Sequence, residues 1–320
     1  MDWSRIRRRM SKGSQPHGVY VSLDQLVRLQ FKARDFSFLP HQPVTSVLSG
    51  RYASRLRGRG LNFEELRHYH PGDDIRTMDW KVTARTREPY VRVYSEERDR
   101  TVMLVVDQRL GMFFGTRRQM KSVSAAEVAA LASWRAVSAG DRVGGFVFND
   151  VECDFHKPAR SRGGVMSLLG SVTRMNHALR VDSSHSASPE ALNDVLRRVH
   201  ATVTHDALIV LISDFDGMDD ESEGLISRLA GRNDIIAVHV QDPARSSLAA
   251  SDVVVSDGVQ RLSLPLSQGD LRRRLVEDHH VEDAELEGFL RRLTAPRLVI
   301  RTDEDVVAQV RRLFGVRPSR

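Results

Sequence analysis

From residue 101 onward, short apolar runs alternate with longer segments of helical spacing, and this alternation restricts the fold more than any other feature. Five runs, at 102–106, 143–148, 208–213, 235–240 and 298–300, are apolar nearly throughout, as strands buried on both faces are. Helical spacing is found at 124–139, 189–199, 221–230, 283–293 and 304–314. The pattern predicts an α/β fold with a doubly wound, mostly parallel sheet. Residues 152–155 are expected to pair antiparallel with the strand before them, at the edge of that sheet.

The first hundred residues lack this alternation. Residues 1–20 show no apolar periodicity and are expected to form a mobile basic tail. Ser22 and Gln25 form a capping-box pattern, which predicts a helix that continues to about Arg34. A loop is expected at 36–60, followed by short strands and turns at 61–99. The expected divisions are therefore a tail at 1–20, a small basic N-terminal region at 21–98, an α/β domain at 99–315 and a tail at 316–320.

Basic charge is concentrated in the N-terminal third. Residues 1–100 contain 20 Lys and Arg against 12 Asp and Glu, whereas the whole chain has a net charge of +6. Such a region attracts nucleic acid, acidic lipid or an acidic protein surface. The single cysteine, Cys153, cannot form an internal disulfide and is expected to be an inert thiol, and the chain has no apolar run of about 18 residues. A cytoplasmic protein without a transmembrane segment is expected.

Two motifs lead into the first apolar strand. Residues 58–76 read GRGLNFEELRHYHPGDDIR, residues 79–85 read DWKVTAR, and the strand ends in VVD at 105–107. Together they resemble the domain-of-unknown-function 58 family, over about 49–314, and the C-terminal part of that family is similar to a von Willebrand factor A domain. The polar and aromatic motif residues are expected to dock on the α/β domain or to form a surface that binds a partner. They are Arg67, Tyr69, Asp73, Asp74, Arg76, Asp79, Trp80 and Arg85.

The resemblance also implies a metal-ion-dependent adhesion site at the end of the first sheet strand. In the family this strand ends in Asp-x-Ser-x-Ser, which holds a divalent cation through one carboxylate and two hydroxyls. Asp107 is present, but Arg109 and Gly111 stand where the two serines are expected, so the site is degenerate. Asp214, which follows the run at 208–213, resembles the second carboxylate, and Asp216 lies two residues further on. Four residues are candidates for the third-loop hydroxyl: Ser183, Ser184, Ser186 and Ser188.

Three arrangements of this strand-end site stay open. In the first, the Arg109 guanidinium takes the place of the cation and pairs with Asp107 and Asp214, so that the site needs no metal. In the second, Asp107 and Asp214 bind Mg²⁺ weakly and water completes the coordination. In the third, Arg109 faces solvent or a partner, and the aspartates only cap loops and helices.

Other candidate sites have weaker patterns. His68 and His70, close to Asp73 and Asp74, could hold a metal ion, although Pro-Gly-Asp-Asp is typical of a turn. A basic patch could bind nucleic acid through phosphate contacts and stacking. It consists of Arg51, Tyr52, Arg55, Arg57 and Arg59. The chain contains no Walker loop, no Gly-x-Ser-x-Gly and no His-Glu-x-x-His.

The expected function is a non-enzymatic protein-interaction module that requires no cofactor. The family resemblance further implies an adaptor that acts with a MoxR-type AAA+ ATPase, or with another von Willebrand A protein, in assembling or activating complexes. If Arg109 replaces the cation, a carboxylate of the partner is expected to pair with its guanidinium, and chelators are expected to have no effect. The alternatives are a basic nucleic-acid-binding accessory protein and a hydrolase that uses Asp107, Asp214 and Asp216 with a metal.

Overall fold

The computed structural model has a central sheet of six strands. They are β3 (Thr101–Asp107), β4 (Arg142–Phe148), β5 (Cys153–Ala159), β6 (Ala207–Ser213), β7 (Asp234–Gln241) and β10 (Arg297–Arg301). Their order across the sheet is β10-β7-β6-β3-β4-β5, and only β5 runs antiparallel to its neighbour. This confirms the expected doubly wound α/β fold with an antiparallel edge strand. Because the strand order reverses at β3, its carboxyl end lies at a position where such sheets form binding crevices.

The structure describes residues 18–33, 61–71, 73–96, 100–180, 187–188, 190–246, 253–256, 261–264 and 269–314. The chain divides into two units. The sheet unit consists of residues 1–41 and 100–320, and the small unit of residues 42–99. The loop expected at 36–60, most of the tail expected at 1–20 and the tail expected at 316–320 lie outside the described residues.

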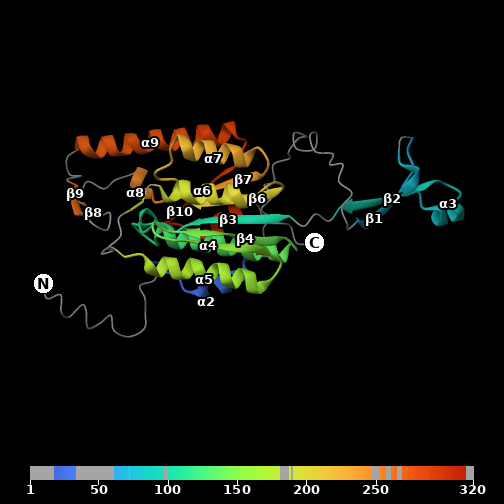
Figure 1. Ribbon diagram of the computed structural model, residues 1–320, viewed down its shortest axis with the longest axis horizontal. Helices are drawn as coiled ribbons and strands as arrows, with labels where there is room; N and C mark the ends of the chain where they lie inside the picture. Colours follow the sequence, from blue (N-terminus) through green and yellow to red (C-terminus); the bar gives the residue numbers. More distant parts are fainter. Residues whose placement is uncertain are drawn as a thin grey trace. The chain divides into compact units, whose positions relative to one another are not determined.

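Helices cover both faces of the sheet (Figure 1). One face packs against α2 (Leu23–Arg28), α4 (Lys121–Ser138), α5 (Arg162–Ala178) and α10 (Val306–Phe314). The other face packs against α6 (Ala191–Thr202), α7 (Asp220–Ala230) and α9 (Gly269–Arg292). The side chains of β3 alternate accordingly, since Val102, Leu104 and Val106 belong to the first core and Met103 and Val105 to the second. This two-sided burial explains why the strand is apolar at every position.

The predicted strands are confirmed, each of the five parallel ones to within one residue at either end. The helices were predicted less completely. α9 begins at Gly269 rather than at residue 283, and α5 was not predicted. Gly163, Gly164 and Gly170 disfavour a helix in isolation. The helix forms because its apolar stripe, which includes Val165 and Leu169, is buried against the sheet.

Residues 18–33 belong to the sheet unit. This assignment differs from the prediction, which placed residues 21–98 in a single N-terminal region. Its helix α2 begins with the predicted capping box of Ser22 and Gln25, and a 3₁₀ turn, η1 (Leu29–Phe31), follows. Leu26 is fully buried, and its carbonyl accepts a hydrogen bond of 3.0 Å from Trp134 Nε1 in α4. The backbone N–H of Val21 donates to Asn176 Oδ1 in α5 at 2.9 Å. Apolar burial and two buried hydrogen bonds therefore fix this segment on α4 and α5.

The small unit contains an antiparallel pair of strands, β1 (Leu61–His68) and β2 (Tyr90–Glu96), as the sequence predicted in outline. Between them lie a 3₁₀ turn, η3 (Ile75–Thr77), and a helix that was not predicted, α3 (Trp80–Thr86). In the sheet unit, α8 (Pro243–Ser246) follows β7, and β8 (Val253–Ser256) pairs with β9 (Arg261–Leu264). No described helix is long and apolar enough to cross a membrane.

Candidate functional site

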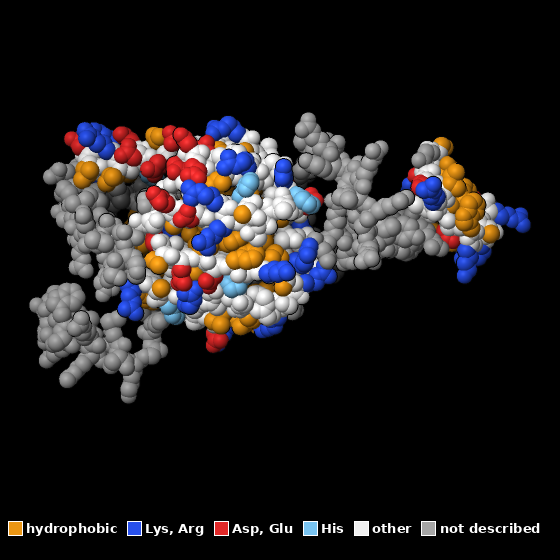
Figure 2. Space-filling model, in the orientation of Figure 1, with side chains coloured by type: hydrophobic (Ala, Val, Ile, Leu, Met, Phe, Trp, Pro, Cys, Tyr) orange, Lys and Arg blue, Asp and Glu red, His pale blue; other side chains and the backbone are white. Residues whose placement is uncertain are grey.

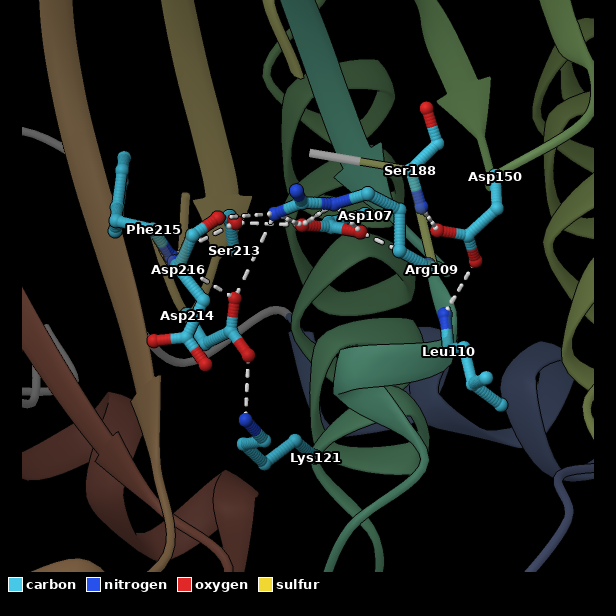
Figure 3. Close-up of polar contacts among 10 residues, drawn as sticks. All are labelled: Asp107, Arg109, Leu110, Lys121, Asp150, Ser188, Ser213, Asp214, Phe215 and Asp216. Carbon is cyan, nitrogen blue, oxygen red and sulfur yellow. Dashed lines mark hydrogen bonds and ion pairs between the residues drawn. The ribbon is translucent and has the colours of Figure 1, made fainter. Parts of the chain in front are cut away.

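The strand-end site is built around a salt bridge between Asp107 and Arg109 (Figure 3). Asp107 is the last residue of β3 and is completely buried, and Arg109 is only 6% exposed. The guanidinium binds the carboxylate in a bidentate manner, with Nε 3.1 Å from both oxygens and Nη2 2.8 Å from Oδ2. The backbone N–H of Arg109 also donates to Oδ1 at 2.9 Å. Such charge-assisted fork contacts are among the strongest polar contacts in proteins.

The end of β6 lies directly beside this pair because β3 and β6 are neighbouring parallel strands. Ser213 donates its hydroxyl to Asp107 Oδ2 at 2.6 Å, and Arg109 Nη2 donates to the backbone carbonyl of Asp216 at 3.1 Å. The same Nη2 lies 3.7 Å from Asp214 Oδ1. Arg109 therefore connects the loop after β3 with the loop after β6.

Lys121 supplies a second buried cation that the sequence reasoning missed. It is the first residue of α4, is 2% exposed and forms an ion pair with Asp214 Oδ2. The site thus balances two buried carboxylates, Asp107 and Asp214, with two buried cations. No sequence pattern indicated this partner, since 93 residues separate Lys121 from Asp214.

Burial and ion pairing act against each other on the two carboxyl groups. Burial favours the protonated form of Asp214, but Lys121 and Arg109 outweigh it and hold the pKa well below its ordinary value. Burial raises the pKa of Asp107 above its ordinary value, although Arg109 and Ser213 act in the opposite direction. The Arg109 guanidinium is itself buried, yet the nearby Asp107 carboxylate raises its pKa, so it is charged at every physiological pH.

Further contacts hold the loops around this cluster. Asp150, in the loop after β4, accepts from the backbone N–H of Leu110 at 2.6 Å and from that of Ser188 at 2.8 Å (Figure 3). A 3₁₀ turn, η4 (Leu110–Met112), follows Arg109. Gly111 in this turn faces Asp214, because a Cβ built on it would lie 3.8 Å from Asp214 Oδ2. Of the four candidate third-loop serines, Ser188 is brought near the site by its backbone, and Ser183, Ser184 and Ser186 lie outside the described residues.

The geometry matches the first of the three predicted arrangements, in which a guanidinium stands between Asp107 and Asp214. Magnesium needs several free oxygen ligands. Here both carboxylates already contact protein cations, and Arg109 and Gly111 stand where the family resemblance implies two serine ligands. This donor set therefore does not suit a divalent cation. Within the described part of the chain, no group of three or more His, Cys, Asp or Glu side chains could hold a metal ion.

The guanidinium leaves little room for the expected carboxylate of a partner. Its Nε and Nη2 are occupied by Asp107 and by the carbonyl of Asp216, and only Nη1 makes no hydrogen bond to a described residue. Only 6% of Arg109 is exposed, so a ligand has little access to its guanidinium. Arg109 mainly joins two loops.

The family-motif residues form local turns and caps in the small unit. Asp79 caps α3 through the N–H groups of Lys81 and Val82, and Asp74 caps η3 through that of Arg76. Arg67 pairs with Asp73 at 2.9 Å. Trp80 is 65% exposed. Tyr69 and Arg85 also belong to this unit. The two expected roles of this surface, docking and partner binding, stay predictions.

The weaker candidates have ordinary structural surroundings. His68 contacts the Tyr90 hydroxyl at 3.0 Å, and His70 contacts Arg67 at 2.8 Å, so both rings belong to local hydrogen-bond networks. Cys153 begins β5 and is partly buried, and this burial raises the pKa of its thiol. A raised pKa disfavours the reactive thiolate. The basic patch at 51–59 lies outside the described residues.

Several known proteins are similar to this chain. The model of a family described as protein of unknown function DUF58 matches residues 65–285. Two uncharacterised proteins, Mb1516 of Mycobacterium bovis and Rv1480 of Mycobacterium tuberculosis, are each 30% identical to the chain over 297 residues, which is 91% of this chain and 90% of theirs. Among solved structures, BatB from Bacteroides thetaiotaomicron is 12% identical with a TM-score of 0.38 and covers 66% of this chain and 93% of its own. The VWA domain of SpRpn10 is 12% identical with a TM-score of 0.35 and covers 67% and 94%.

Proposed function

This chain belongs to the DUF58 family, and we propose that it is a non-enzymatic protein-interaction module whose strand-end site works without a metal ion. The observation that carries this proposal is the buried cluster of Asp107, Arg109, Asp214 and Lys121. In an adhesion site of the metal-dependent type, a divalent cation joins the strand-end loops and presents a charge to the partner. Here the two protein cations neutralise the carboxylates, and Arg109 joins the loops by itself.

A metal-independent site has a consequence for recognition. Because the cluster is internally neutral and almost fully buried, it holds the loops after β3 and β6 in one arrangement without waiting for a ligand. A preorganised surface loses less conformational entropy when a partner binds. The module is therefore ready for binding at any divalent-cation concentration.

The partner proposed for this module is a MoxR-type AAA+ ATPase, or another von Willebrand A protein, with the chain acting as an adaptor in the assembly or activation of a protein complex. This part of the proposal is supported only by the family resemblance. Direct capture is therefore the appropriate test.

The test is affinity capture of the tagged full chain from its native cells, with and without EDTA, followed by mass spectrometry. The expected result is recovery of an AAA+ ATPase in equal amounts under both conditions. Asp216→Lys, which reverses a charge at the rim of the site, should reduce recovery. Asp234→Lys, which reverses an exposed charge at the opposite end of the sheet, should not.

Three results would contradict the proposal in different ways. Loss of the partner on addition of EDTA would show that a metal takes part. Equal recovery with both charge reversals would move recognition away from the strand end. Recovery of no protein, but of nucleic acid in a salt-dependent manner, would favour the nucleic-acid-binding alternative.

A further inference from the structure

A groove of about 250 Å³ lies next to the strand-end site, between the loop after β6 and helix α9. This volume is somewhat below the range of sites for drug-sized ligands, which is about 300–1,000 Å³, so the groove suits a single side chain. Acidic side chains gather over α9 and the neighbouring α7 (Figure 2). No described lysine or arginine lines the groove, but six carboxylates do. These carboxylates belong to Asp214, Asp216, Glu223, Glu282, Asp283 and Glu285.

Glu282 and Glu285 form no ion pair with a described residue, whereas three of the other carboxylates do. Asp214, Asp283 and Glu223 form ion pairs with Lys121, Arg297 and Arg292, respectively. Glu282 and Glu285 lie three residues apart on α9, so they share one face of the helix, and both are exposed. They give the rim of the groove an uncompensated negative charge.

His239 adds an independent feature that points to a ligand. It lies in β7, is 5% exposed and lines the groove. Arg297 donates to its Nδ1 from Nη2 at 2.8 Å, so the ring proton must be on Nε2. Burial, assisted by Arg297, lowers the pKa of His239 to about 3, which keeps the ring neutral. No described residue accepts a hydrogen bond from its Nε2–H, so this donor is open to a ligand in the groove.

The rest of the lining is mostly apolar, apart from a second histidine, His279. Phe215, Met218 and Leu286 line the groove together with the acidic residues. The ring of Phe215 packs edge-on against His239, with their centroids 5.7 Å apart. Long basic side chains bury their methylene stems against such walls and keep the charged end among carboxylates. The groove therefore combines an apolar wall, a negative rim and one fixed hydrogen-bond donor.

We infer that this groove receives a lysine or arginine side chain of a protein partner. The charged end lies against Glu282 and Glu285, and a main-chain carbonyl beside it accepts a hydrogen bond from His239 Nε2. The inference rests on the proposed interaction role, and it specifies the chemistry that the partner presents. It does not depend on which protein the partner is.

The test uses the full chain labelled with ¹⁵N-histidine and titrated with acetyl-arginine methylamide, which carries both a guanidinium and main-chain carbonyls. We expect a saturable shift of the His239 Nε2 signal with a Kd of about 1 mM, as for a single side chain without its protein. Acetyl-norleucine methylamide, which has a stem but no charge, should cause no saturable shift. The signal is assigned with a His239→Gln variant.

Two double variants separate the groove from general electrostatic attraction. Glu282→Gln with Glu285→Gln should weaken binding about fivefold to tenfold, because two partly exposed ion pairs are lost. Glu277→Gln with Asp278→Asn removes the same charge from exposed positions of α9 outside the groove, and should change the Kd by less than about twofold.

Equal weakening by the two double variants, or no saturable shift up to about 50 mM ligand, would overturn the inference. This result differs from a failure of the proposed function. If the titration succeeds and capture recovers no AAA+ ATPase, the groove stands and the partner is a different basic protein. If capture succeeds and the titration fails, only the groove is rejected.

Discussion

At the scale of single residues, one buried side chain, Arg109, pairs with Asp107 and joins the loops after β3 and β6. It lies two residues from Asp107, so a pairing between them could be anticipated from the sequence, and the structure places the two side chains in a bidentate contact. Lys121 could not be anticipated in this way. It meets Asp214 only because α4 begins beside the end of β6, and that approach is a property of the folded sheet.

The first prediction rests on the proposal that Arg109 takes the place of a metal ion. Arg109→Ser introduces a hydroxyl but leaves Asp107 buried without its cation, so the free energy of unfolding should fall by about 3–5 kcal/mol. Millimolar Mg²⁺ should restore part of this loss in the variant and leave the wild type unchanged. Urea unfolding with and without Mg²⁺ measures both effects.

Arg117→Ser is the matched control, because its side chain is 73% exposed and should contribute less than about 1 kcal/mol. Stabilisation of the wild type by Mg²⁺ would show that its site holds a metal ion after all.

The second prediction concerns pH. The pKa of Asp214 in the folded protein lies below its ordinary value, so Asp214 contributes stability that is present above about pH 4 and is lost as the pH falls below it. The difference in unfolding free energy between the wild type and Asp214→Asn should therefore be constant from pH 5 to pH 7 and shrink by about 1.4 kcal/mol per pH unit below pH 4. Denaturant unfolding over this range measures the slope, and a difference that grows in acid would contradict the assignment.

At the scale of helices and strands, periodicity predicted most of the sheet unit, and it failed where packing overrides local preference. The apolar runs located the five parallel strands because a strand buried on both faces has no polar positions. The glycines of α5 concealed a helix that is stabilised only by its contact with the sheet. The capping box at Ser22 located α2, but no local signal showed that its buried face, with Leu26, belongs to the core of the sheet unit.

This placement of α2 leads to the third prediction. Leu26→Ala should lower the free energy of unfolding of the sheet unit by about 2–5 kcal/mol, as for a leucine removed from a packed core. Phe31→Ala, at a side chain that is 66% exposed, should change it by less than about 0.5 kcal/mol. Urea unfolding followed by circular dichroism compares the two. Equal small effects would mean that α2 is only loosely attached.

At the scale of the whole molecule, two units of very different construction share one chain. The sheet unit buries two apolar cores, one on each face of six strands. The described residues of the small unit form two strands and one short α-helix, and Leu66, Ile75 and Trp80 among them are exposed. Isolated two-stranded sheets are only marginally stable. The sequence indicated a boundary near residue 99 from the start of the strand-helix alternation, but it gave no indication that residues 18–33 belong with the larger unit.

The fourth prediction follows from this difference. Backbone amides of β3 and β6 should exchange with deuterium only through global unfolding, because both strands are buried and have neighbours on each side. Amides of β1 and β2 should exchange at least about a hundredfold faster through local opening. Hydrogen-exchange mass spectrometry resolves the two regions. Equal protection would mean that the small unit is stabilised by a contact with another surface.

The interruption of the sheet unit by residues 42–99 has a consequence for proteolysis. A single cut of the chain between residues 33 and 100 would produce two fragments, yet residues 18–33 would stay bound through Trp134, Asn176 and the buried Leu26. The nicked protein should behave as one particle until it is denatured. The same two fragments, produced separately, should reassemble, whereas a fragment that starts at Arg100 alone would expose part of its core and tend to aggregate.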